Sequence, residues 1–144
     1  MWLEDPGKSL LDGIAQTQES WPANARTIIA LGDVIFSAAA VKTIVTDDSP
    51  LALYGRRGPN AVTEKPHGEV FAVAFWAGEQ PAFLQFVNET GSWTGRRLWD
   101  LEQSIAQARG VCPFVSITDF TDDIDTPDDL KTLPLIEREM GGSD

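Results

Sequence analysis

Apolar positions along the chain fall into runs of strand length separated by stretches with helical spacing. The longest run, residues 26–36, is rich in β-branched side chains and is interrupted only by Gly32-Asp33. A near-continuous apolar run is typical of a strand buried on both faces, as in the parallel part of an α/β sheet. Further strands are predicted at residues 51–55, 69–76 and 114–118.

Helical spacing occupies most of the chain between these runs. The first helix is predicted to begin after Ser9, a suitable N-cap, and to end before Pro22. Ser37 is the predicted N-cap of a helix over residues 38–46. Further helices are predicted at residues 81–89, at residues 98–109 and after Thr126. Strands alternating with helices predict an α/β domain, here a single domain over residues 1–144.

Composition and charge narrow the possible partners. No apolar run approaches the roughly 20 residues of a membrane span, and no basic segment followed by an apolar one resembles a signal peptide. The single cysteine, Cys112, fits a reducing compartment, so we expect a cytoplasmic protein. The net charge of −11 repels nucleic acid and anionic membrane, and neither is an expected partner.

Two acidic motifs are candidates for metal chemistry. Asp33 follows an apolar strand, and ligands of open α/β sheets bind beyond the carboxyl ends of strands. A carboxylate there suits magnesium, which prefers hard oxygen donors, although it could equally cap a turn. In the second motif, Asp123 and Asp125 alternate with Ile124 and share one face of an extended backbone. A divalent cation would relieve their repulsion; the alternative is a helix start with solvated acids.

Together the motifs resemble a known superfamily. Leu-Gly-Asp-Val at 31–34, followed by Asp-Ile-Asp-Thr-Pro-Asp-Asp-Leu at 123–130, is similar to the MobA-like and sugar-nucleotide-synthesising nucleotidyltransferases. The resemblance covers roughly residues 7 to 131 and extends to the order of the predicted elements. It implies a Rossmann-like nucleotide-diphospho-sugar transferase fold, here incomplete, with a mixed sheet flanked by helices. It also implies transfer of a nucleoside monophosphate from a nucleoside triphosphate to a small phosphorylated or sugar acceptor, with release of pyrophosphate.

The resemblance also implies roles for individual residues. Asp33 and Asp125 match the two aspartates that bind catalytic Mg²⁺, and Asp123 matches an additional ligand of the cytidylyltransferase branch. Ser9 and Leu10 match a segment near the nucleotide base. The paired arginines are candidates for acceptor binding, because guanidinium groups bind phosphate oxygens bidentately: Arg56, Arg57, Arg96 and Arg97.

One departure from the superfamily's pattern is large. Its members begin with a strand and a glycine-rich loop that hold the triphosphate, and nothing in this chain resembles that loop. Gly55-Arg-Arg-Gly58 comes after the Gly-Asp strand and lacks the flanking elements of a phosphate loop. The chain is therefore expected to be part of a longer protein, a relative that has lost catalysis and serves as a binding module, or a subunit that completes its fold as a homo-oligomer.

Other chemistries have little to draw on. His67 is the only histidine, so neither a structural zinc site nor a Cys-His constellation is predicted. Among the five tryptophans, Trp76 ends a predicted strand and Trp99 lies on a helical apolar stripe. We expect both in the hydrophobic core.

Overall fold

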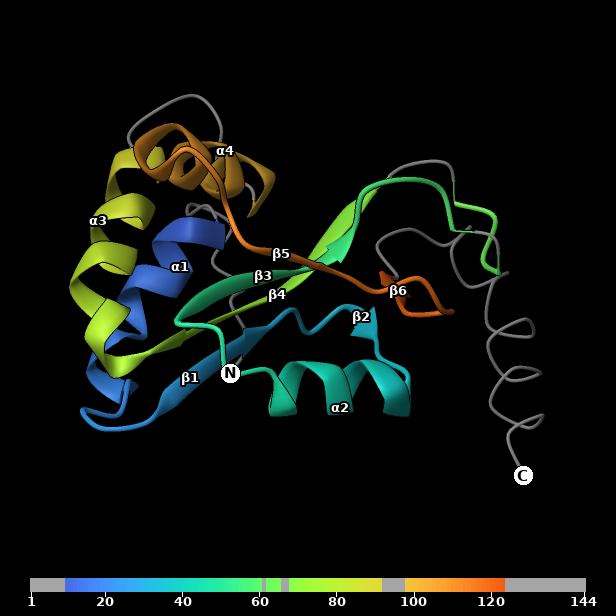
Figure 1. Ribbon diagram of the computed structural model, residues 1–144, viewed down its shortest axis with the longest axis horizontal. Helices are drawn as coiled ribbons and strands as arrows, with labels where there is room; N and C mark the ends of the chain where they lie inside the picture. Colours follow the sequence, from blue (N-terminus) through green and yellow to red (C-terminus); the bar gives the residue numbers. More distant parts are fainter. Residues whose placement is uncertain (1–9, 61, 66–67, 92–97, 124–144) are drawn as a thin grey trace.

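The computed structural model describes residues 10–60, 62–65, 68–91 and 98–123 (Figure 1). Short 3-10 turns at Gln18–Ser20 and Ala77–Glu79 accompany the helices. The helices and strands follow the chain in this order: α1 (Leu10–Gln16), β1 (Arg26–Ala30), β2 (Val34–Ile35), α2 (Ala38–Thr46), β3 (Leu51–Arg56), β4 (Glu69–Trp76), α3 (Gln80–Gly91), α4 (Leu98–Arg109), β5 (Phe114–Ser116) and β6 (Asp122–Asp123).

The described strands form a four-stranded mixed sheet and a separate two-stranded ladder. The strand order of the larger sheet is β1-β4-β3-β5. β4 is antiparallel to both of its neighbours, and β5 is parallel to β3. β1, β3 and β5 therefore run in one direction, and their carboxyl ends lie at the same edge of the sheet. The smaller ladder pairs β2 with β6 in antiparallel register.

Helices cover both faces of the larger sheet. On one face, α1, α3 and α4 pack against β3 and β4 in a cluster whose fully buried members include Leu11, Phe83 and Ile105. On the other face, α2 packs against the same strands through Ala40 and Ile44. Figure 1 shows this arrangement, with the three helices at one end of the sheet and α2 alone beneath it. The class predicted from the sequence, α/β with a mixed sheet, is confirmed.

Several elements lie where the apolar periodicity places them. β4 and α4 have the predicted bounds, and so does α2. The Ser37 side chain accepts a hydrogen bond from the Ala40 backbone N–H, which confirms it as the N-cap of α2. The helix predicted after Thr126 lies outside the described residues.

The prediction for residues 26–36 is wrong in two respects. Instead of one long strand, Gly32 and Asp33 form a turn that separates β1 from β2. β1 is also an edge strand that is antiparallel to its neighbour, and two of its residues, Ile28 and Ala30, are exposed. An edge strand of mixed composition and a buried parallel strand share the same apolar pattern, so periodicity alone does not separate them.

The predicted burial of two tryptophans has a mixed outcome. Trp76 is 42% exposed at the end of β4, so its assignment to the core is wrong. Its indole N–H donates to the Asp48 carbonyl, which holds the ring at the surface. Trp99 is partly buried and packs against the core, with its ring stacked on Phe114. Among the described residues, no helix has the length and apolar character needed to cross a membrane.

Candidate functional site

Polar residues gather where β1, β3 and β5 end. β1 is followed by the Gly32-Asp33 turn, β3 ends at Arg56 and is followed by Arg57, and β5 leads into the acidic segment from Asp119 to Asp123. In open α/β sheets, ligands bind beyond the carboxyl ends of the parallel strands. This edge is therefore the candidate functional site.

The β2–β6 ladder brings the two acidic motifs together. In its register Val34 pairs with Asp123 and Ile35 pairs with Asp122. Asp33, which is exposed, immediately precedes Val34, and in an antiparallel ladder the residue before Val34 approaches the residue after Asp123. Segments separated by almost the whole described chain thus lie side by side at the backbone level.

A buried carboxylate anchors this ladder. Asp122 has no solvent exposure, and its Oδ2 lies 3.3 Å from Nη1 of Arg56, which is itself only 4% exposed. The same oxygen accepts hydrogen bonds from the Asn60 amide (3.2 Å) and from the Thr63 hydroxyl. Buried charges need such pairing, because removing one partner leaves the other uncompensated in a low-dielectric interior. Arg56 also donates to the Gly58 carbonyl, and so it fixes the start of the loop after β3.

Asn60 connects that loop to the acidic segment. Its side-chain oxygen accepts hydrogen bonds from the backbone N–H groups of Val62 and Thr63, while its amide donates to the Asp119 and Thr121 carbonyls. Asn60 is 2% exposed, so its amide is fully used inside the protein. The loop after β3 and the segment after β5 are therefore one hydrogen-bonded unit.

The same unit reaches the start of α2. Ser37, besides capping the helix, donates its hydroxyl to Asp119, and its backbone N–H donates to the Thr121 hydroxyl (3.0 Å). Asp119 in turn accepts from the Thr121 backbone N–H (2.9 Å). The segment between β2 and α2 is consequently held against the segment between β5 and β6, next to the paired acidic motifs.

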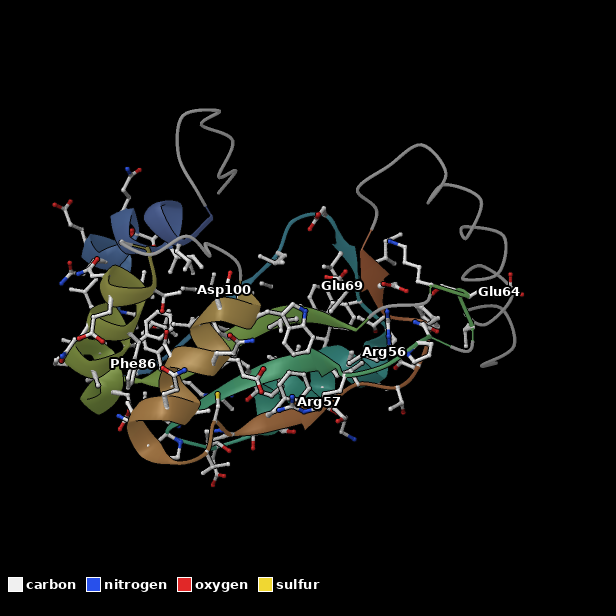
Figure 2. The ribbon with its side chains drawn as sticks, turned by 90° about the horizontal axis from the view of Figure 1, so that it is seen from above. Arg56, Arg57, Glu64, Glu69, Phe86 and Asp100 are labelled. Carbon is white, nitrogen blue, oxygen red and sulfur yellow. The ribbon has the colours of Figure 1, made fainter. Side chains whose placement is uncertain are left out.

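Arg57 contrasts with its neighbour Arg56, because its side chain is 54% exposed. Its guanidinium lies 4.1 Å from the centroid of the Phe114 ring and forms an ion pair with Glu102 of α4. Phe114 stacks in turn on Trp99, at a centroid separation of 5.9 Å. Figure 2 shows Arg56 and Arg57 near the end of β3 that faces β6, away from Phe86 at the helical end.

Cys112 lies close to this stack but is not a candidate nucleophile. The thiol is buried, and burial together with the negative charge of Glu102 raises its pKa to about 12. A thiol with such a pKa is protonated at neutral pH and unreactive. The chemistry of this edge therefore depends on its carboxylates and guanidinium groups.

Several residues singled out from the sequence lie outside the described residues: Ser9, Arg96, Arg97 and Asp125. Leu10 is the first residue of α1, and Asp123 belongs to β6. Within the described part of the chain, no group of three or more histidine, cysteine, aspartate or glutamate side chains is arranged to hold a metal ion. The predicted magnesium ligands Asp33, Asp123 and Asp125 are thus placed beside one another by the backbone of Val34 and Asp123 alone.

Sequence reasoning missed the residues that build this edge. Asp122, Asn60 and Thr63 carry the buried network, yet Asn60 was taken only as turn chemistry and Asp122 only as one of six clustered aspartates. A polar residue that is buried by tertiary contacts has no local signature. Comparisons of the chain with protein-family models, with curated proteins and with solved structures give no match.

Proposed function

We propose that this chain carries the metal-binding edge of a nucleotidyltransferase-type α/β domain. In this proposal, Asp33 and Asp125 hold a Mg²⁺ ion and Asp123 is an additional ligand. The reaction is transfer of a nucleoside monophosphate from a nucleoside triphosphate to a small phosphorylated or sugar acceptor, with pyrophosphate as the leaving group. The proposal includes the finer fold assignment, a Rossmann-like nucleotide-diphospho-sugar transferase fold.

The antiparallel pairing of β2 with β6 is the observation that carries the proposal. The resemblance to the nucleotidyltransferases rests on two short motifs that are remote in sequence, and it requires their carboxylates to meet. The register Val34 to Asp123 supports this requirement, because it sets the turn that contains Asp33 against the segment that continues to Asp125. Two unrelated acidic turns would have no reason to share a ladder.

The donor set fits the proposed ion. Carboxylate oxygens are the ligands that Mg²⁺ prefers, and Asp33 is exposed, so water molecules can complete its coordination. A bound Mg²⁺ would supply neutralisation of the charge that develops on the transferred phosphoryl group. The chain's own contribution is to hold the carboxylates in place, through the buried network of Asp122, Asn60 and Thr63.

The two described arginines have different parts in this proposal. Arg57 is half exposed at the carboxyl edge and keeps one face of its guanidinium against Phe114, which suits it to bind a phosphate of the acceptor. Arg56 is buried against Asp122, which suits it to position β6 rather than to contact a ligand. Arg96 and Arg97 remain candidates for acceptor binding.

Calorimetric titration tests the proposal. With Mg²⁺ present, each nucleoside triphosphate is titrated into the wild-type chain, into Asp33→Asn and into Asp48→Asn. Asp48 is an exposed carboxylate next to the amino end of β3, at the opposite edge of the sheet, and it controls for loss of charge alone. We expect one triphosphate to bind in a Mg²⁺-dependent manner to the wild type and Asp48→Asn, and at least about tenfold more weakly to Asp33→Asn.

The contrary result is absence of heat with every triphosphate. The described residues include no glycine-rich loop between a strand and a helix of the kind that cradles phosphates. Mg²⁺ binding without triphosphate binding would therefore identify a non-catalytic module that retains the cation site. Such a result would overturn the transferase function.

A further inference from the structure

The outer edge of β1 is open and unprotected within the described part of the chain. β1 pairs with β4 on one side, and no described strand pairs with its other side. Exposed edge strands are usually protected by lysine, proline, a bulge or an inward-pointing charge, since an unprotected edge is a template for another strand. The sequence Arg-Thr-Ile-Ile-Ala of β1 has none of these protections, apart from Arg26 at its first position.

Arg26 does not protect the edge either, because its charge is used inside the molecule. Its guanidinium donates to the Ile44 carbonyl and to the Tyr54 hydroxyl, and it lies 3.9 Å from the Asp47 carboxylate. The side chain is only 8% exposed. The open edge is therefore uncharged, in a chain whose net charge is −11. It is a place where two such acidic chains can approach without strong repulsion.

The backbone of β1 presents three residues to this edge. The Leu31 N–H donates to the Phe71 carbonyl of β4, 3.1 Å away. In an antiparallel ladder, backbone groups alternate between the two sides of a strand. Thr27 and Ile29 therefore bond towards β4, while the N–H and C=O groups of the alternate residues Arg26, Ile28 and Ala30 point outwards.

This pattern is symmetric about Ile28. If a second β1 pairs antiparallel with the first about a twofold axis, Ile28 faces Ile28 of the other copy, and Arg26 faces Ala30. Every outward-pointing N–H and C=O then meets a partner. A twofold axis between antiparallel strands is perpendicular to the sheet, so both copies keep the same face in common.

Exposed apolar side chains border the open edge on the α2 face. Ile28 is 40% exposed, and Val41 and Val45 of α2 are 48% and 60% exposed. Ile28 and α2 enclose a hollow of about 110 Å³ with an entirely apolar lining, which also includes Phe36 and Ile44. Grouped apolar exposure of this kind marks an interaction surface rather than a normal solvated one. The symmetric pairing would bring both copies of Ile28 and α2 onto one face and remove these side chains from water.

We propose that two copies of this chain associate through β1, as an antiparallel edge-to-edge pair centred on Ile28 and flanked by the two α2 helices. The result is a continuous eight-stranded sheet across the dimer. This surface is distinct from the carboxyl-edge site, so its test is independent of the proposed transferase function.

Sedimentation equilibrium of the full chain tests the dimer. We expect a monomer–dimer equilibrium for the wild type and at least about a tenfold loss of association for Ile28→Lys, which places a charge on the edge. Val45→Glu, on the exposed face of α2, should weaken association without any change in β1. Val111→Lys is the matched control, because Val111 is 66% exposed and lies between α4 and β5, far from β1 along the sheet. Circular dichroism confirms that each variant is folded.

A cross-linking experiment tests the register itself. Facing residues of a hydrogen-bonded antiparallel pair have Cα atoms about 5.5 Å apart, a separation that a disulfide spans. Ile28→Cys should therefore form a disulfide dimer on mild oxidation, whereas Val111→Cys should not; the native Cys112 is buried. A monomer at all accessible concentrations would overturn the proposal. So would association that survives both Ile28→Lys and Val45→Glu, since another surface or another bound segment would then be responsible.

Discussion

At the residue scale, the buried pair of Arg56 and Asp122 is the feature on which the acidic edge depends. Asp122→Asn removes the carboxylate and leaves the Arg56 guanidinium buried without its counter-charge. Breaking a buried pair on one side costs about 3–5 kcal/mol. Urea denaturation should show a loss of this size, while Asp48→Asn at the exposed opposite edge should stay within about 0.5 kcal/mol. A loss for Asp122→Asn no larger than the control would contradict the assigned pairing.

A second residue-scale prediction concerns the pH dependence of stability. The hydrogen bond from the Tyr54 hydroxyl, with smaller contributions from Ser49 and Arg26, lowers the pKa of Asp47 below its ordinary value of 3.8. Burial and the bond to Asp47 also raise the pKa of Tyr54. A carboxylate whose folded-state pKa is depressed contributes stability at neutral pH that is lost as pH falls through that pKa.

The variant Tyr54→Phe isolates this effect. We expect the pKa of the Asp47 carboxyl, followed by NMR titration, to rise towards its ordinary value. The destabilisation caused by the variant should also be larger at pH 7 than in acid below the folded-state pKa, where Asp47 is protonated in both proteins. An unchanged titration of Asp47 would show that the hydrogen bond does not control its charge.

At the scale of elements, β3 and β4 approach too closely for a side chain at one position. The register between them shifts at Tyr54 and Gly55, and a Cβ on Gly55 would lie 2.2 Å from the Glu69 carbonyl oxygen. Because that contact is with backbone, relief requires the strands to separate. Gly55→Ala should cost about 1–3 kcal/mol in thermal or urea unfolding. Gly58→Ala, where no atom lies within 4 Å of the new Cβ, should be close to neutral.

The sequence predicts elements well where local signals suffice. Helical periodicity and an N-capping serine define α2, and a long run of valine and aromatic residues defines β4. β2 and β6 have two residues each, too few for any periodicity, and they exist because of a pairing between distant segments. β1 was taken for a strand buried on both faces, since an apolar run carries no information about which strands will be its neighbours.

At the scale of the whole molecule, the α/β class follows from the sequence but the strand order does not. The order β1-β4-β3-β5 depends on which strands pack together, and this is decided by long-range contacts. The candidate site shows the same division. Asp33 could be singled out from its place after a strand, whereas Asn60 and Thr63 acquire their importance only when the loop after β3 folds against the acidic segment.

The account's central claim is that Asp33 and Asp125 share one divalent cation across the β2–β6 ladder. A double-mutant cycle on Mn²⁺ affinity, read by electron paramagnetic resonance as a probe for Mg²⁺, tests it most directly. If both carboxylates hold the same ion, Asp33→Asn and Asp125→Asn should each weaken binding by at least about tenfold, and the double variant should be scarcely weaker than either. Losses that add independently, or affinities equal to that of Asp48→Asn, would contradict a shared site.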